Sequence, residues 1–178
     1  MFSSHPENGV GRTNRFIGFC LVAGILWCVP HPSYASDANS DTDRRALINL
    51  TQNYFNAVAA RDTASLRDYL LPNAQFIYRN GEPLNSMIGV TTVPDLLVKL
   101  PVLSGDLLER MREPTVLVQG NIGMLWTRYD FYQNKQFSHC GTDAFTFLKT
   151  QDGWRIAGGS WSVEKTTCNP EPLNLPLK

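Results

Sequence analysis

Residues 122–165 read IGMLWTRYDFYQNKQFSHCGTDAFTFLKTQDGWRIAGGSWSVEK, and this stretch decides the fold. Two polar pairs, Asn134-Lys135 and Asp152-Gly153, divide it into three long runs in which apolar and polar residues alternate. Alternation with a period of two, interrupted by tight turns, predicts three consecutive antiparallel strands. Strands of this length twist and curl, so we expect a strongly curved sheet, with a bulge or bend at Gly158-Gly159.

Helical patterns precede these strands. Leu47, Leu50, Tyr54 and Val58 recur at spacings of three and four, which predicts an amphipathic helix over about 41–60. We also expect a helix from about 62 to 71, a strand over 74–78 with a hairpin turn at Asn80-Gly81, a helix from about 92 to 100, and a strand over 115–118. This order predicts an α+β fold, with N-terminal helices packed in the concave face of a strongly curved antiparallel sheet.

The first residues have the pattern of a secretory signal peptide. Arg12 and Arg15 precede an uncharged apolar run, 16–29, that is too short to span a bilayer as a helix. Ser33-Tyr34-Ala35 follows with small residues at the first and third positions, which suits cleavage after Ala35. We therefore expect a signal peptide at 1–35, a polar leader at 36–40, one domain at 41–168 and a proline-rich tail at 169–178. The location would be periplasmic or secreted, with no membrane association after cleavage.

The processed chain would retain two cysteines, Cys140 and Cys168. In an oxidising compartment such a pair favours a disulfide, which would close a loop and stabilise the fold by roughly 3–4 kcal/mol on the chain-entropy model. Two separate buried thiols are the alternative, because the register derived below does not place the two residues directly opposite each other.

Several motifs, in this order, resemble a known superfamily. They are Asn53-Tyr54-Phe55-Asn56-Ala57 with Asp62 and Leu66, Leu70-Leu71-Pro72-Asn73-Ala74-Gln75-Phe76, Gly89, Phe145-Thr146-Phe147-Leu148-Lys149 and Asp152-Gly153-Trp154-Arg155-Ile156. Together they resemble the nuclear-transport-factor-2-like superfamily, a cystatin-like α+β cone, in its SnoaL-like or polyketide-cyclase-like branch. The resemblance implies a cone-shaped pocket between helices and sheet, and often a homodimer. It does not imply one activity, because members of one fold carry different functions.

Turn geometry predicts which side chains face that pocket. An even-sized loop at Asn134-Lys135 places Asp130 opposite His139 and Trp126 opposite Asp143, on one sheet face. That face should be the interior, because the loop at Asp152-Gly153 places Phe145 on it beside apolar neighbours. The predicted site residues are Asp143, His139 and Asp130 for proton transfer, and Tyr54, Tyr78, Trp126, Arg128, Tyr132 and Phe145 for ligand binding.

Two functions from different classes fit this set. The protein binds a small, mostly apolar molecule without catalysis, with its charged residues forming a satisfied ion network. Alternatively it is a cofactor-independent lyase or isomerase, such as a dehydratase, a ketosteroid-isomerase-like enzyme or a cyclase. In that case Asp143 or His139 moves a proton, Asp130 orients His139 and favours its protonated form, and Arg128 steadies negative charge. We favour binding, because buried charges must pair whether or not catalysis occurs.

The composition limits the classes of partner and cofactor that we expect. Lys plus Arg and Asp plus Glu both number 16, without a basic run, which argues against a nucleic-acid partner. One histidine beside one cysteine does not supply the three or four converging ligands of a metal site, and neither proposed function needs a cofactor. Trp161 and Val163, expected on the outer face of the last strand, are candidates for a homodimer surface.

Overall fold

The computed structural model describes residues 38–80 and 87–170, which fall in one compact unit, Ala35–Lys178. The expected signal peptide, the second residue of the Asn80-Gly81 turn and the end of the tail lie outside the described residues. The helices are α1 (Ala38–Ala60), α2 (Thr63–Tyr69), α3 (Val93–Lys99) and the short 3₁₀ helix η1 (Leu100–Val102). The strands are β1 (Leu70–Asn80), β2 (Ile88–Thr92), β3 (Leu107–Gln119), β4 (Ile122–Gln133), β5 (Gln136–Thr150) and β6 (Gly153–Val163).

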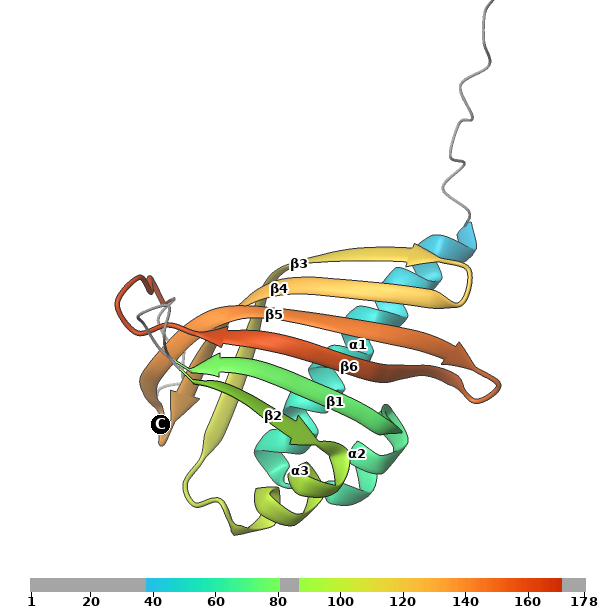
Figure 1. Ribbon diagram of the computed structural model, residues 1–178. Helices are drawn as coiled ribbons and strands as arrows, with labels where there is room; N and C mark the ends of the chain where they lie inside the picture. Colours follow the sequence, from blue (N-terminus) through green and yellow to red (C-terminus); the bar gives the residue numbers. More distant parts are fainter. Residues whose placement is uncertain (1–37, 81–86, 171–178) are drawn as a thin grey trace, which may run out of the picture. The chain divides into compact units, whose positions relative to one another are not determined.

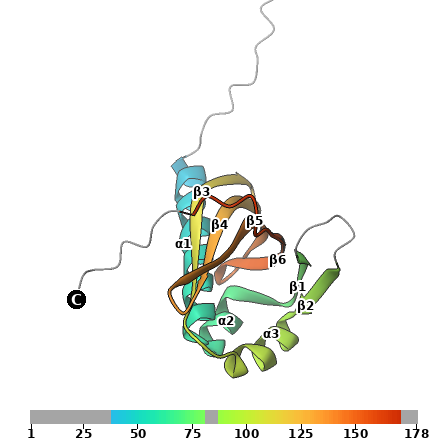
Figure 2. The same cartoon turned by 90° about the vertical axis from the view of Figure 1, so that its left-hand side faces the viewer.

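One six-stranded sheet, in the order β2-β1-β6-β5-β4-β3, curves around helix α1 and stays open between β2 and β3 (Figure 1). All neighbours are antiparallel except β1 and β6, which are parallel. Seen from the side, α1 runs along the concave face, with α2 and α3 at one end (Figure 2). The α+β class and the concave packing of the helices are confirmed. The strongly curved, mostly antiparallel sheet is confirmed too, and β1 and β6 form its single parallel pair.

Short polar side chains begin the two small helices. Asp62 accepts hydrogen bonds from the backbone N–H groups of Ala64 and Ser65, and Thr92 accepts one from Asp95 N–H. These caps satisfy N–H groups that lack a partner within the helix. The helix starts expected near residues 62 and 92 are therefore confirmed, together with their physical cause.

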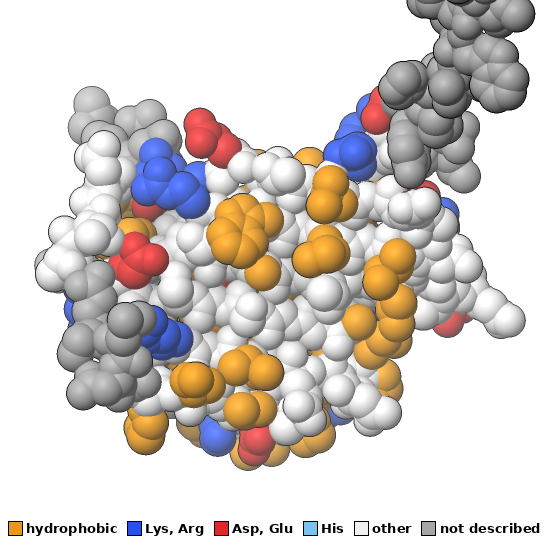
Figure 3. Space-filling view, turned by 45° about the horizontal axis from the view of Figure 1, so that its top comes forward, with side chains coloured by type: hydrophobic (Ala, Val, Ile, Leu, Met, Phe, Trp, Pro, Cys, Tyr) orange, Lys and Arg blue, Asp and Glu red, His pale blue; other side chains and the backbone are white. Residues whose placement is uncertain are grey.

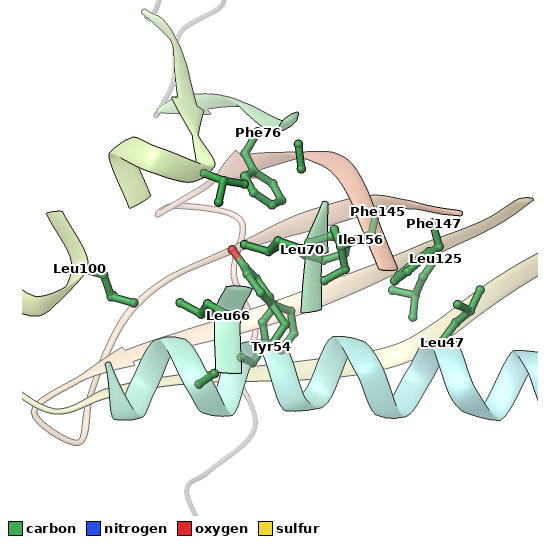
Figure 4. Packing of buried hydrophobic residues seen from close by; sticks show 14 of the residues in the cluster. Leu47, Tyr54, Leu66, Leu70, Phe76, Leu100, Leu125, Phe145, Phe147 and Ile156 are labelled. Carbon is green, nitrogen blue, oxygen red and sulfur yellow. The ribbon is translucent and has the colours of Figure 1, made fainter. Parts of the chain in front are cut away.

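Apolar side chains from α1 fill the inside of the curve. Leu47, Tyr54 and Phe55 are buried against Phe145 and Phe147 of β5 (Figure 4). The rings of Tyr54 and Phe145 meet edge to face with centroids 5.7 Å apart, a favourable aromatic geometry. The cone is therefore filled by packed side chains at this level.

A charged contact fixes the N-terminal part of α1 on the sheet. The Asp43 carboxylate accepts hydrogen bonds from Lys149 Nζ and from Trp154 Nε1, each at 2.9 Å. These bonds from Trp154 and Lys149 lower the pKa of Asp43, since both stabilise the charged form. The contact sets where the helix lies along β5 and β6.

A β-bulge in β5 shifts its register against β4. Next to the turn Tyr132 pairs with Phe137, but one step further Phe131 pairs with His139, so Ser138 is an extra residue. Because side chains alternate between faces, this one-residue shift changes which β4 side chains share a face with the odd-numbered β5 residues. The register predicted from the turn alone is therefore wrong beyond Ser138.

A second bulge lies in β3. Glu113 and Pro114 together oppose Thr127 of β4, and Glu113 adopts a positive φ of 48°. The buried Thr127 hydroxyl accepts a hydrogen bond from Arg112 N–H at 3.1 Å and lies 2.8 Å from the Arg112 carbonyl oxygen, to which it donates. One threonine side chain thus satisfies backbone groups that the interrupted ladder leaves unpaired. At this point β3 bends sharply (Figure 1).

A disulfide joins Cys140 of β5 to Cys168, with Cα atoms 5.8 Å apart. Backbone hydrogen bonds between Cys140 and Glu164 run beside it, so the segment after β6 lies along β5. The structure therefore contains the expected disulfide and not two separate buried thiols. The objection from register does not apply, because Cys168 follows the end of β6 and does not belong to its ladder.

Thr127→Val tests the role of the hydroxyl at the β3 bulge. The isosteric change removes the hydrogen bonds to Arg112, so we expect the free energy of unfolding to fall by about 1–3 kcal/mol. Thr115→Val, at an exposed position of the same strand pair, is the matched control and should change stability by less than about 0.5 kcal/mol. Urea denaturation of both variants measures the difference, and equal effects would exclude a special role for Thr127.

Candidate acidic site on the concave face

Asp143 lies on the inner face of β5, and its side chain is 3% exposed. It pairs with Trp161 of β6 and precedes Phe145 and Phe147 along the same face of β5. Its Oδ2 atom has no hydrogen-bond partner within the described residues. A buried, unsatisfied carboxyl oxygen is costly for folding, so this position marks a candidate functional site.

Glu109 of β3 is the neighbour of Asp143. The two carboxyl groups are close enough to share a hydrogen bond, and burial raises the pKa of Glu109 to about 7. Burial, followed by the charge and hydrogen bond of Glu109, also raises the pKa of Asp143 well above its ordinary range. Two desolvated carboxyls this close resist ionising together, so the pair holds a proton near neutral pH.

Two tyrosines border the carboxyl pair. Tyr54 of α1 and Tyr129 of β4 lie close enough for the charges of Glu109 and Asp143 to act on them. Burial, together with the charges of Glu109 and Asp143, raises the pKa of both phenols, so they remain neutral donors. Tyr129 lies across Gly141 and donates to the Ser162 carbonyl at 2.7 Å. A Cβ atom at Gly141 would lie 2.0 Å from that same carbonyl oxygen, so the close approach requires glycine.

An aromatic wall continues from the pair across the sheet. Trp161 of β6 and Tyr78 of β1 stack with ring centroids 5.0 Å apart and an interplanar angle of 7°. The Tyr78 ring lies over Gly89 of β2, where any Cβ atom would collide with it. Trp161, Tyr78 and Glu109 each keep partial exposure while Asp143 is buried, so solvent reaches the edge of the site but not its floor.

Five of the sequence-predicted residues share this inner face: Tyr54, Tyr78, His139, Asp143 and Phe145. The predicted positions of Trp126 and Arg128 are wrong. Trp126 is 59% exposed on the outer face, and Arg128 is exposed beside it on the same strand. The bulge at Ser138 is the cause, because it places the odd-numbered residues of β4 inside.

Asp130 and Tyr132 are buried, but on the opposite face from Asp143. Asp130 pairs with Arg112, whose Nη1 lies 3.2 Å from Oδ2, and the Arg110 guanidinium lies over the Tyr132 ring. The segment after β6 reaches this region, since Arg112 also donates to the Asn169 carbonyl. The predicted Asp130–His139 pair is therefore wrong, and Asp130 belongs to a structural ion pair.

His139 is inside the curve but is separated from Asp143 along β5. It stacks on Phe131 with ring centroids 4.7 Å apart and lies 3.0 Å from the Ser138 hydroxyl. Four residues along a strand separate it from Asp143, about 13 Å at 3.3 Å per residue. Burial and the charge of Lys165 lower the pKa of His139, which is the opposite direction to the one expected beside Asp130.

Sequence reasoning missed Glu109. If the register of β3 and β4 next to the Gly120-Asn121 turn continued without interruption, Glu109 would pair with Tyr132 and lie on the outer face. The bulge at Glu113-Pro114 moves the pairing by one residue, and Glu109 then opposes Phe131 on the inner face. The Glu-Pro pair inside an alternating strand was the available signal, because proline interrupts a ladder.

A separate pocket of about 380 Å³ lies between α2, β1 and α3. It is lined by Arg67, Leu70, Pro72, Val93, Pro94, Leu97 and Val98. Within residues 38–80 and 87–170, no three His, Cys, Asp or Glu side chains are grouped to hold a metal ion. No helix in those ranges is long and apolar enough to cross a membrane.

The curved sheet around α1 defines a nuclear-transport-factor-2-like α+β cone, and comparison with solved structures agrees. An NTF2-like protein with a cystatin-like fold from Novosphingobium aromaticivorans matches with a TM-score of 0.59 and 12% identity, covering 70% of this chain and 84% of that chain. An NTF2-like superfamily protein from Salmonella enterica serovar Typhimurium gives 0.58 and 15%, covering 74% and 98%. A "putative dehydratase from the NTF2-like family" of Streptomyces avermitilis gives 0.56 and 13%, covering 70% and 97%.

Residues 42–162 match the model of the family described as "Putative lumazine-binding", and the chain belongs to this family. Comparison with curated proteins gave no match. The family and the structural neighbours agree on an NTF2-like fold, while at these identities the solved structures establish the fold alone.

The acid pair predicts a particular pH dependence of stability. An acid whose pKa rises from 4.5 to about 7 on folding binds more protons in the folded state between those values, so its contribution to stability falls as pH rises through that range. Glu109→Gln removes the ionisable group and with it this loss of stability at high pH. We expect the variant to be more stable than the unmodified protein by about 1–3 kcal/mol at pH 8, with little or no gain at pH 4.5.

Urea denaturation at both pH values measures this difference, and Asp68→Asn, on the exposed side of α2, is the control. A variant that is destabilised equally at both pH values would show that Glu109 is not a buried acid with a raised pKa.

Proposed function

We propose that the concave face binds a small molecule with an apolar body, beside the Glu109–Asp143 pair. The observation that carries the proposal is a buried carboxyl oxygen without a partner next to a partly exposed aromatic stack. A site that only stabilised the fold would not need an unsatisfied acid at that position. Membership of a family described by lumazine binding supports a small-molecule ligand, although it does not identify one.

Binding of the neutral fluorescent probe N-phenyl-1-naphthylamine tests this function. We expect saturable binding near one probe per chain, because the stacked pair of Trp161 and Tyr78 offers an aromatic plane. Trp161→Leu keeps apolar volume against Phe76 but removes that plane, and should weaken binding about tenfold. Trp126→Leu, on the outer face, is the matched control and should leave the affinity unchanged.

Circular dichroism of both variants checks that the fold is retained. Equal loss in the two tryptophan variants, or no saturable binding by the unmodified protein, would refute a ligand site on the concave face.

A proton-transfer reaction is the second candidate, favoured by the pKa of Glu109 near 7. An acid with this pKa donates and accepts protons near neutral pH, as a lyase or isomerase without a cofactor requires. Dehydration is one reaction of this kind, and it is the activity that the description of the Streptomyces avermitilis protein of the same fold gives. In this candidate Glu109 takes the place assigned to His139 from the sequence, because Glu109 adjoins Asp143 and His139 does not.

The proposal includes export of the protein, with cleavage of the signal peptide after Ala35. The Cys140–Cys168 disulfide supports it, because such bonds persist in oxidising compartments. The basic and apolar pattern of residues 12–35 supports it independently.

The proposal also includes a homodimer, through the outer face of the sheet. The expected contact residues Trp161 and Val163 do not lie on the outer face. Trp161 stacks on Tyr78 inside the curve, and Val163, two residues further along β6, lies on the same inner face. A row of uncharged residues instead crosses five strands on the outer face: Trp126, Ala144, Ser160, Ile77 and Val90. Hydrophobic side chains gather over this face, with charged ones mainly at its margins (Figure 3).

A second copy of the chain fits such a face, because the two subunits of a two-fold symmetric dimer contact each other through the same surface patch. We expect light scattering after size exclusion to give twice the protomer mass for the unmodified protein. Trp126→Glu should give the protomer mass, because it places a charge in the row of uncharged residues. Val98→Glu, at an exposed position of α3, should remain dimeric, and a monomeric unmodified protein would refute the dimer.

A further inference from the structure

We propose that the Glu109–Asp143 pair recognises a small organic cation, an amine or amidine whose apolar body lies along the Trp161–Tyr78 stack. This inference rests on the proposed function and names the ligand class of the same site. Its starting point is geometric. Two carboxyl groups from β3 and β5 meet inside the curve, and Asp143 Oδ2 is buried without a partner.

The acid pair lacks the compensation that buried carboxylates normally have. Asp43 has Lys149 within 2.9 Å, and Asp130 has Arg112 within 3.2 Å. By contrast, burial raises the pKa of Glu109 even though its hydrogen bond with Asp143 lowers it, while burial and the charge and hydrogen bond of Glu109 raise the pKa of Asp143. No positive charge of the described residues contributes to either shift. A buried negative charge requires a counter-charge or hydrogen-bond donors, so a cationic ligand would complete this site.

The groups around the pair come from each neighbouring element. Helix α1 contributes Tyr54, β4 contributes Tyr129 and β6 contributes Trp161, while Glu164 lies just after the end of β6. All of these are neutral or negative. Arg110 does not alter this balance, because it lies over Tyr132 on the opposite face of the sheet.

The aromatic wall favours the same ligand class. Tryptophan and tyrosine rings attract a cation through their negative faces, and desolvation strengthens this attraction. An anionic ligand would face the two acids, and no Lys or Arg of the described residues contributes to their pKa values. A neutral ligand would gain the apolar contacts but would leave the acid pair uncompensated.

Benzamidine and benzamide test the charge preference, because they have nearly the same shape and differ in charge. Competition against N-phenyl-1-naphthylamine at pH 8 should show benzamidine binding at least about tenfold more tightly than benzamide. Lowering the pH from 7 to 6 should weaken benzamidine binding by up to about tenfold, because the pair must release a proton to receive the cation. Benzamide binding should not change over the same range.

Asp143→Asn and Glu109→Gln should each remove most of the benzamidine preference, while the affinity for the neutral probe stays within about twofold. Asp68→Asn, an exposed acid on α2, should keep the preference. Equal binding of the two compounds at pH 8, or a preference that survives both inner-face variants, would overturn the inference while leaving the ligand site intact. Loss of probe binding by the unmodified protein would instead refute the proposed function itself.

Discussion

The chemistry of the concave face depends on two one-residue shifts in strand register. The extra residue Ser138 in β5 and the Glu113-Pro114 pair in β3 each displace one strand relative to β4. Because strand side chains alternate between faces, a one-residue shift exchanges the whole set that points inward. The first bulge sends Arg128 outside, and the second brings Glu109 inside. Without either, the inner face would hold a different set of charges.

The fold supports an acid pair that is costly by itself. Packing of α1 against Phe145 and Phe147 closes the cone at one level, and the contact of Asp43 with Lys149 holds that helix in position. At the next level, Asp143 and Glu109 lie where solvent is excluded from the floor but reaches the edge. Hydrophobic packing elsewhere therefore supplies the free energy that retains an unsatisfied polar group, a common feature of functional sites.

Local patterns in the sequence predicted most elements because their causes are local. Helix starts followed from the capping residues Asp62 and Thr92, and the tight turns located the ends of β4, β5 and β6. The strand expected over 115–118 was too short, since β3 begins at Leu107 and continues through a proline. Proline and positive φ normally end a strand, and here the hydrogen bonds between Thr127 and Arg112 bridge the bulged segment.

The sequence by itself determined the α+β class, the order of the elements other than β2, and the inward direction of Asp143 and Phe145, because alternation and turn residues act over short distances. The tertiary structure alone decided that Asp143 meets Glu109, and that Asp130 pairs with Arg112 instead of His139. These partners lie on different strands, and their meeting depends on bulges whose effect is to shift a register by one residue. A turn signal cannot report such a shift, since it fixes pairing only up to the next irregularity.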